Sequence, residues 1–433
     1  MRDLAMLGVM LFMVPMALRN GLVAFLLWGY FSLLTPKFYM HGFMQNIRYV
    51  FIFAAIAIVF VAAKKVKNIG KLQWQSTNIL LVLFVLQGAM SWLLGIDPNP
   101  LSEDRFVFFA KGVAFCLLMP YFINTRWRVH ALLLMIALGL GVHGVIEGLK
   151  YISSAGAHRV NGIPNSSLSD NNLFAVGMVM VIPLMIYLSQ YSRNKLVAVG
   201  CAIAALLTVL CVLGTNSRGG FLGLAAVGGW LFLSSRKKFR AMLFIVAGCI
   251  VVYYFAPDVW FERMSTINSA DEDASFMGRV AAWRISSAIA LANPLFGGGF
   301  HAVEIQWIWD LYREAPNLLP FVTLQDIPLI AKASHSIYFQ VLGDMGFIGM
   351  ALFLAILTNA FWVARDIRSL AAKQEEHEWL VDLAKSIMVS LVAYIVSGGG
   401  VGLAYYELSW ILLSLLGILR QILLQQVNNL KTA

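Results

Sequence analysis

One stretch of the chain concentrates the residues able to do chemistry. Residues 333–349 read ASHSIYFQVLGDMGFIG and begin where the longest polar segment, 257–336, meets an apolar run. His335 therefore places a titratable ring at the mouth of a membrane-embedded helix. An imidazole has an ordinary pKa of about 6.5, so it can accept a proton near neutral pH. The position indicates a general base, and a hydrogen-bonded interfacial histidine is the alternative.

Three arginines stand beside apolar surface between the predicted spans. Arg159 lies in AHRVNGIPN, Arg218 in GTNSRGG, and Arg279 follows FMG. Guanidinium is permanently charged and forks onto paired oxygens, so arginines that converge at one level suit a phosphate or pyrophosphate. A lone arginine could instead extend to the phospholipid headgroups.

Aromatic residues of the polar segment and its exit are candidate contacts for a sugar or acceptor. They are Trp283, Trp307, Trp309 and Tyr338, and anchoring at the membrane interface explains the tryptophans equally well. Asp271 and Asp273 spell D-x-D in a polar loop, where we expect no metal. The chain has no H-E-x-x-H, no Walker A loop and no G-x-G-x-x-G opening a Rossmann unit. We therefore expect neither a metal nor a cofactor.

The composition identifies the elements that must position these residues. Hydrophobic residues make up 60% of the chain and charged ones 12%, and the mean hydropathy is +0.77. Apolar runs of about 15–22 residues recur, the length that crosses a bilayer as helix, and they lack the alternation of barrel strands. The prediction is an all-α polytopic membrane protein that forms a single integral membrane domain, 1–433. The four cysteines lie in apolar runs and are expected to be buried thiols.

About twelve transmembrane helices are expected. The first apolar region, 4–34, contains Pro15 and the break Arg19-Asn20-Gly21, and it is either one broken span or two short ones. The expected spans are 4–34, 49–63, 79–95, 106–122, 131–149, 171–189, 196–213, 219–234, 241–256, 337–361, 386–402 and 408–424.

The loops alternate in charge. Basic residues collect near 64–71, 126–128, 193–195, 236–240 and 365–373, whereas 257–336 holds five basic and nine acidic residues. Positive loops stay in the cytoplasm, so the long loop is expected outside, facing the periplasm. Its tryptophans and prolines indicate an ordered loop, with a short interfacial helix at 278–292. The net charge of +10 then reflects topology, and no nucleic acid partner is expected. No cleavable signal sequence is evident.

Three motifs resemble those of the bacterial O-antigen ligase and O-antigen polymerase superfamily. They are Asn216-Ser217-Arg218-Gly219-Gly220, the Gly278-Arg279…Trp283…Pro294…Gly297-Gly298-Gly299 block, and the histidine element running from His335 to Gly349. Together they cover residues 155–360, in the matching order. The N-terminal stretch, from Met1 to Pro36, also resembles O-glycosylation ligases associated with exosortase systems.

The resemblance implies a membrane glycosyltransferase of the GT-C type in the bacterial inner membrane. It would move a glycan from undecaprenyl pyrophosphate to an acceptor hydroxyl, most often on lipid A-core oligosaccharide, at the periplasmic face. In that reading Arg218, Arg279 and Arg159 hold the pyrophosphate, His335 takes the acceptor proton, and the anomeric configuration inverts without a metal. Asp344 lies too deep in the following helix to reach the same atom, so it is expected to be structural.

Two rival functions remain from the sequence. An O-antigen polymerase or a protein O-glycosylation ligase would use the same donor, and neighbouring genes would separate them from a ligase. A polyprenyl-lipid or solute transporter would also have many spans and buried arginines. Transporters usually show internal repeats and charges near the middle of the bilayer. No repeat is evident here, and the candidate cations gather at one face.

Overall fold

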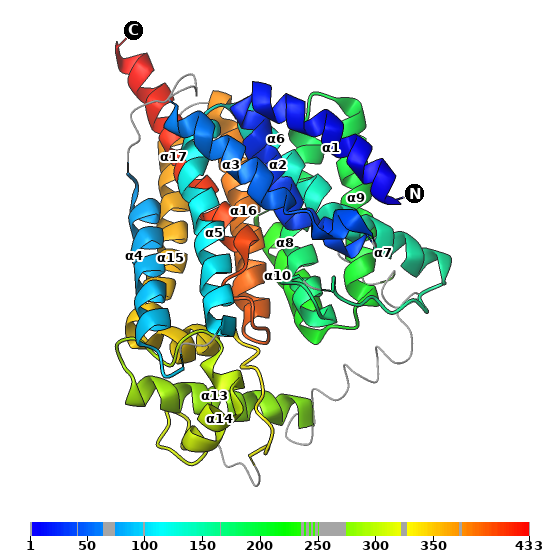
Figure 1. Ribbon diagram of the computed structural model, residues 1–433. Helices are drawn as coiled ribbons and strands as arrows, with labels where there is room; N and C mark the ends of the chain where they lie inside the picture. The colour runs from blue at the N-terminus through cyan, green and yellow to red at the C-terminus, as the bar shows by residue number, and fades with distance from the viewer. Residues whose placement is uncertain are drawn as a thin grey trace.

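The computed structural model describes residues 2–40, 42–63, 74–97, 100–164, 166–234, 274–321, 327–371 and 375–432, with isolated positions between 238 and 250. Throughout these ranges the regular structure is helical and no strand occurs, which confirms the all-α prediction. The longer helices form a bundle, and α13 and α14 lie across one of its ends (Figure 1). They are α1 (Arg2–Arg19), α2 (Gly21–Leu34), α3 (Tyr49–Ala62), α4 (Ser76–Leu94), α5 (Pro100–Phe122), α6 (Arg126–Gly139), α7 (Gly141–Ser153), α8 (Asn171–Tyr191), α9 (Lys195–Gly214), α10 (Arg218–Ser234), α13 (Ala274–Ala292), α14 (Gln306–Tyr312), α15 (Ile337–Ala371), α16 (Glu378–Gly398) and α17 (Glu407–Thr432).

The described helices support a multi-pass membrane protein. Seven of them are long and apolar enough to cross a bilayer, or up to eight if the pair α6 and α7, bent by 40°, counts as one span. Shorter apolar helices include α2 and α3. Within these described helices the expected number of about twelve is therefore not confirmed. The expected span at 241–256 lies almost wholly outside the described residues.

Several helices extend beyond the expected spans for one physical reason. Hydropathy marks only the apolar part of a helix, whereas the hydrogen-bonded helix continues into the polar interface. Thus α5 begins at Pro100 instead of 106, α15 continues to Ala371 instead of 361, and α16 begins at Glu378 instead of 386. The break in the first apolar region falls at Asn20, whose side chain caps α2 by accepting a hydrogen bond from the amide of Leu22.

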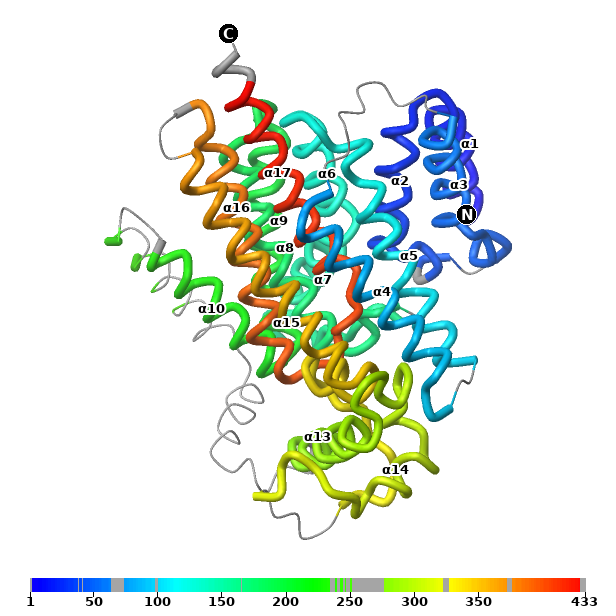
Figure 2. The backbone as a smooth tube through the Cα atoms, turned by 90° about the vertical axis from the view of Figure 1, so that its left-hand side faces the viewer, coloured from blue at the N-terminus to red at the C-terminus, as the bar shows by residue number. Residues whose placement is uncertain are grey.

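The interior of the bundle is built around α8, α15, α16 and α17. Helix α8 packs against α9 and α16, α10 packs against α16 and α8, and α15 packs against α4, α16 and α17. In Figure 2 the axes of α15, α16 and α17 run side by side across the bundle. Most of α8 and α17 is buried, while α4 and α5 expose much of their apolar surface. This arrangement fixes the ends of α8, α10 and α16 relative to one another.

The layer at one end of the bundle, which we call the outer layer, consists of α13, α14 and the segments around them (Figure 1). It has a small core of its own, which includes Ala282, Ile285, Ile308 and the fully buried Trp309. Helix α13 also packs against α15. A helix is therefore present where the sequence predicted one at 278–292, and its apolar face covers protein.

Helix α15 is interrupted at Gly346, where φ is +68°. The interruption frees backbone carbonyls inside the apolar bundle, where unpaired polar groups are costly. The amides of Gly298 and Gly299 donate to the carbonyls of Gly343 and Asp344 at 2.8 and 3.0 Å. The side chain of Gln87 donates to the carbonyl of Met345 at 3.1 Å. The turn at Gly297-Gly298-Gly299, called the three-glycine turn below, thus has a structural role: it holds α15 at its interruption.

The end of the bundle opposite the outer layer carries the described turns that are rich in basic residues. Arg126 lies over the ring of Trp379, at 5.2 Å from its centroid. The Tyr191 hydroxyl donates to Asp382 at 2.5 Å, and Arg420 bridges to Asp366 at 3.1 Å. These contacts join the α5–α6, α8–α9 and α15–α16 turns, away from the outer layer (Figure 1). The described basic turns thus lie at one end, as the predicted segregation of loop charge requires; the basic run 64–71 and most of 236–240 lie outside the described residues.

Candidate active site

His335 lies two residues before the start of α15, and its backbone is held on both sides. Its φ is +42°, a left-handed conformation that is unusual for histidine. The carbonyl of the preceding Ser334 accepts a hydrogen bond from the indole nitrogen of Trp283 at 2.6 Å. The amide of Gln340 donates to the carbonyl of Ser336 at 2.8 Å and so starts the helix. The backbone at His335 is therefore fixed on both sides, next to the start of α15.

The surroundings of His335 favour its neutral ring. Burial lowers its pKa below the ordinary 6.5, and the nearby Arg279 guanidinium lowers it further. Asp170 and Glu304 oppose this shift without cancelling it. The ring is half-buried, and among the described residues it makes no hydrogen bond. A neutral imidazole with an uncommitted nitrogen is the form that a general base requires.

Arg279 reaches the C-terminal end of α16. Its Nη1 donates to the carbonyl of Gly400 at 3.2 Å, just past the last residue of the helix. A Cβ at Gly400 would lie 3.6 Å from the same Nη1, and a Cβ at Gly402 would lie 4.0 Å from the Cα of His335. The segment after α16 therefore runs past both residues, and its glycines leave room beside them. A guanidinium carries five N–H donors in a planar fork, a geometry that suits paired oxygens.

Arg218 is the first residue of α10, and the first turn of that helix contacts the same end of α16. The Ser397 hydroxyl donates to the carbonyl of Gly219 at 2.8 Å, which ties the first turn of α10 to α16. The Ser217 hydroxyl donates to Asn172 at the start of α8, at 2.8 Å. Arg218 and Arg279 thus flank the end of α16 from different helices, and both side chains are half-buried.

Arg159 is placed differently from the other two arginines. The amide of its neighbour Val160 donates to the carbonyl of Gly214 at 2.8 Å, so the segment lies beside the end of α9. The Arg159 side chain is exposed. The fold brings this residue near the turn that leads to Arg218, but its backbone contacts are not with the end of α16.

The aromatic candidates mostly have structural roles. Trp283 stacks on Phe339, with ring centroids 5.2 Å apart, and holds Ser334 as described above. The Tyr338 hydroxyl donates to the carbonyl of Ile395 on α16 at 3.0 Å. Trp309 is fully buried, so its expected role as a sugar contact is wrong. Trp307 is 49% exposed on α14 and donates to Asp97 at 3.2 Å, so its outer ring face is accessible.

Asp344 connects the break in α15 to the segment after α16. One carboxylate oxygen accepts the amide of His301 at 2.9 Å, and the other accepts the Tyr405 hydroxyl at 2.9 Å. Gln340 adds a second link by accepting the amide of Ala404 at 3.1 Å. Asp344 is buried and fully engaged, which matches its expected structural role. The hydrogen bonds from Tyr405 to Asp344 and from Ala404 to Gln340 fix the 399–406 segment, which passes His335 and Arg279.

Two acidic residues that act on His335 were not predicted from the sequence. Asp170 caps α8 by accepting the amides of Asn172 and Leu173, and only that capping role has a local signal. Glu304 pairs with His301 at 2.6 Å. The pairing lowers the pKa of Glu304 and raises that of His301 despite the burial of both. Their closeness to His335 depends on tertiary packing.

The described residues contain no group of three His, Cys, Asp or Glu side chains placed to hold a metal ion. Asp271 and Asp273, the D-x-D pair, lie outside the residues that the structure describes. The cations of the site are arginines contributed by α10 and α13. Electrostatic stabilisation of an anion at this face can therefore come from protein groups.

Comparison with known proteins adds an independent observation. Residues 202–354 match the family model described as O-antigen ligase. This part of the chain is similar to the O-antigen ligase family. The match includes Arg218, Arg279 and His335 and confirms the resemblance expected from their motifs. Residues 1–193 match a family of unknown function. A search of curated proteins finds no match to the chain.

The O-antigen ligase match and the helices support a membrane enzyme of the ligase and polymerase type, one that acts in glycosyl transfer. The matched region ends within α15 and so contains the His335 element together with the outer layer. The ends of α8 and α16, which complete the site, lie outside the match. The geometry therefore extends the candidate site beyond the matched residues.

Proposed function

We propose that the protein is an O-antigen ligase that moves a glycan from undecaprenyl pyrophosphate to an acceptor hydroxyl, with lipid A-core oligosaccharide as the acceptor. The observation that carries this proposal is the convergence of Arg218, Arg279 and His335 on the end of α16. One face of the bundle thus presents two guanidiniums and a neutral imidazole. That combination suits a leaving pyrophosphate and a hydroxyl nucleophile.

The arginines hold the leaving group. Arg218 and Arg279 come from separate helices and can engage a pyrophosphate through forked N–H donors, while the polyprenyl chain stays in lipid. As the glycosidic C–O bond breaks, negative charge grows on the pyrophosphate, and fixed cations stabilise it without reorganising. Arg159, on the exposed segment beside α9, is the third candidate for this contact.

His335 acts on the acceptor. Its ring takes the hydroxyl proton as the acceptor oxygen attacks the anomeric carbon, and the pyrophosphate leaves from the opposite side. The new bond forms on the face opposite the broken one, so the anomeric configuration inverts. The depressed pKa of His335 keeps the ring neutral at physiological pH. No metal and no nucleotide enters these steps, and the site faces the periplasm of the inner membrane.

A transfer assay with purified protein tests this function. Lipid-linked glycan and lipid A-core in excess EDTA are expected to give the joined product. His335→Asn should lower turnover by about a hundredfold to ten-thousandfold, the usual worth of a general base. Asparagine tolerates a left-handed φ, so this change leaves the backbone at His335 unstrained.

Donor binding separates a catalytic role from a structural one. The His335→Asn protein should bind undecaprenyl pyrophosphate like the wild type, because the arginines are intact. Wild-type turnover per folded molecule would refute the base assignment. Product formed from lipid-linked glycan alone, without lipid A-core, would identify a polymerase instead of a ligase.

A further inference from the structure

A cavity of about 730 Å³ lies between α2, α3, α5 and the start of α17. Its walls are mainly apolar and include Trp28, Phe31, Phe115 and Ile411. At its edge Phe51 is 67% exposed and Ile58 48% exposed, both on α3. Large apolar side chains exposed on a membrane-spanning bundle face hydrocarbon, so the cavity opens toward lipid.

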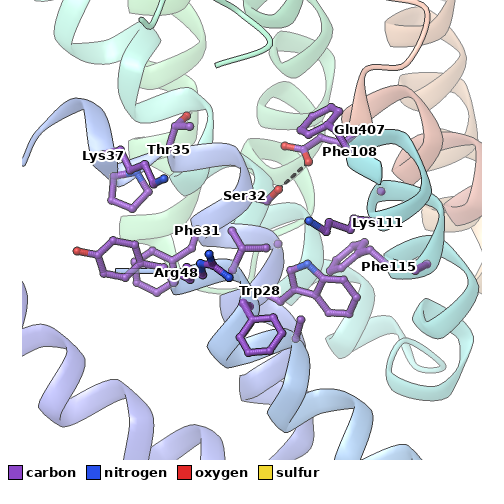
Figure 3. Close-up of a pocket in the computed structure, with 18 of the residues that line it drawn as sticks. Trp28, Phe31, Ser32, Thr35, Lys37, Arg48, Phe108, Lys111, Phe115 and Glu407 are labelled. Carbon is purple, nitrogen blue, oxygen red and sulfur yellow. Dashed lines mark hydrogen bonds between the residues drawn. The ribbon is translucent and has the colours of Figure 1, made fainter. Parts of the chain in front are cut away.

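Three cations line this otherwise apolar space: Lys37, Arg48 and Lys111. Figure 3 shows Arg48 and Lys111 extending into the cavity from opposite walls. Among the described residues none of the three forms a hydrogen bond or an ion pair to a side chain. Lys111 lies midway along α5, a candidate membrane span, where an ionisable residue without a partner is costly.

The one carboxylate of the cavity is already engaged. Glu407, at the start of α17, accepts the Ser32 hydroxyl at 2.6 Å, as the dashed line in Figure 3 shows. Its Cβ lies 3.7 Å from the position of a Cβ at Gly112, so α17 closes against α5 at this point. The three cations therefore outnumber the acidic groups of the cavity, and an anion of the right shape would satisfy them.

We propose that this cavity binds a membrane phospholipid with an anionic headgroup. The phosphate would lie between Arg48 and Lys111, with Lys37 at its outer side, and a hydrocarbon chain would follow Trp28 and Phe115. Charge complementarity and the apolar walls argue for a lipid over a soluble anion. The volume is in the range of small-molecule sites and holds a headgroup with part of one chain.

This lipid site is separate from the proposed active site but adjoins it through one segment. Residues 399–407 pass Arg279 and His335 at one end and reach the cavity at Glu407. Tyr405 within that segment is bonded to Asp344. A bound lipid would therefore contact the same piece of backbone that shapes the candidate active site. The inference does not depend on glycan transfer, because only binding is claimed.

Native mass spectrometry of delipidated protein tests the proposal. Phosphatidylglycerol, which is anionic, should bind more tightly than phosphatidylcholine of the same chain length. The double variant Arg48→Gln with Lys111→Gln should weaken phosphatidylglycerol binding by about fivefold for each cation removed. Lys111→Arg keeps the charge and should bind like the wild type, which separates loss of charge from loss of fold.

The matched control removes two cations away from the cavity, at the end of the bundle that carries the basic turns. Arg365→Gln with Lys385→Gln changes the net charge equally and should leave phosphatidylglycerol binding unchanged. Equal affinity of the wild type for both lipids, or an Arg48/Lys111 double variant that binds like the wild type, would overturn the proposal. Displacement of the lipid by millimolar inorganic phosphate would also overturn it, by showing that a soluble anion suffices.

Discussion

At the residue scale, the chemistry of the site depends on how His335 is kept neutral. Its ring is half-buried beside Arg279, and both conditions disfavour the imidazolium form. Asp170 and Glu304 pull in the other direction, so the balance is sensitive to single substitutions. The same arginine is proposed to hold the pyrophosphate, which couples donor binding to the protonation of the base.

The pH dependence of transfer should report this balance. A base must be neutral, so kcat/KM should rise with pH through the His335 pKa, which lies below 6.5. The midpoint of the acidic limb is therefore expected below pH 6.5 in the wild type. Arg279→Gln removes one cause of the lowered pKa and should move the limb to higher pH. A wild-type midpoint at or above 6.5 in a transfer assay over pH 4.5–8 would contradict this assignment.

Arg279→Lys tests whether transfer needs the planar guanidinium, which can donate two N–H groups to paired oxygens. Lysine keeps the charge but replaces the forked donors with a single ammonium, so we expect transfer to fall by about tenfold to a hundredfold. The measurement is initial rate against donor concentration. Arg313→Lys is the control, because Arg313 also donates to a backbone carbonyl in the outer layer, that of Ile327 at 2.6 Å. Equal effects in the two variants would assign Arg279 a purely structural role.

At the element scale, the break in α15 positions the start of that helix. Gly346 has a φ of +68°, and a Cβ there would come within 2.6 Å of the carbonyl oxygen of Pro294. The Phe347 amide donates to that same carbonyl at 2.9 Å. The short segment that begins at Ile337 is therefore set against the three-glycine turn by backbone contacts.

Gly346→Ala should destabilise the protein by about 1–3 kcal/mol, from the strained φ and the clash with Pro294 together. Thermal unfolding in detergent, followed by tryptophan fluorescence, would measure the loss. Gly228→Ala on α10 is the matched control, because nothing lies within 4 Å of its added Cβ. That change should be neutral or slightly stabilising, since alanine favours helix. Equal melting temperatures for the two variants would show that the break tolerates a side chain.

The sequence predicted some elements well because polar residues mark their ends. The starts expected at 219, 337 and 408 fall within one residue of Arg218, Ile337 and Glu407. The end of α16 was missed because residues 401–404 are apolar yet not helical. The Tyr394 hydroxyl donates to the carbonyls of Leu403 and Ala404 there, so an irregular backbone is satisfied inside protein. Hydropathy contains no information about such contacts.

In the candidate site, too, local sequence signals were found and tertiary contacts were missed. Motif residues such as His335 and Arg279 were visible in the sequence, because their types and order carry the signal. Asp170 and Glu304 were not, since nothing local relates them to a histidine far along the chain. Trp283 was found, but as a sugar contact; its hydrogen bond to Ser334 appears only when α13 packs against α15.

At the scale of the whole molecule, the two ends of the bundle differ in charge and in construction. One end carries the basic turns held by Arg126, Tyr191 and Asp366, and the other carries the outer layer with the candidate active site. The charge difference supports a periplasmic outer layer through the positive-inside rule.

Reporter fusions test this orientation. Alkaline phosphatase, which is active only in the periplasm, should be active when inserted at Asn317 in the outer layer and inactive when inserted at Asn194 between α8 and α9. A cytoplasmic reporter such as green fluorescent protein should give the opposite pattern at the same two sites, which controls for expression. Phosphatase activity at Asn194 would place the site on the cytoplasmic side and contradict the proposed donor.

The shared hydrogen bonds between the three-glycine turn and α15 also determine how the protein can move. The amides of Gly298 and Gly299 satisfy carbonyls that α15 itself leaves open, so moving the outer layer away would leave these carbonyls unpaired. Hinged closure over a substrate, common in soluble transferases, is therefore blocked at this joint. Under the proposed function both substrates are lipid-anchored, and they would reach the site by diffusing in the plane of the membrane. Turnover in cells would then be limited by the surface density of the two lipids, and bilayer viscosity would enter the observed rate.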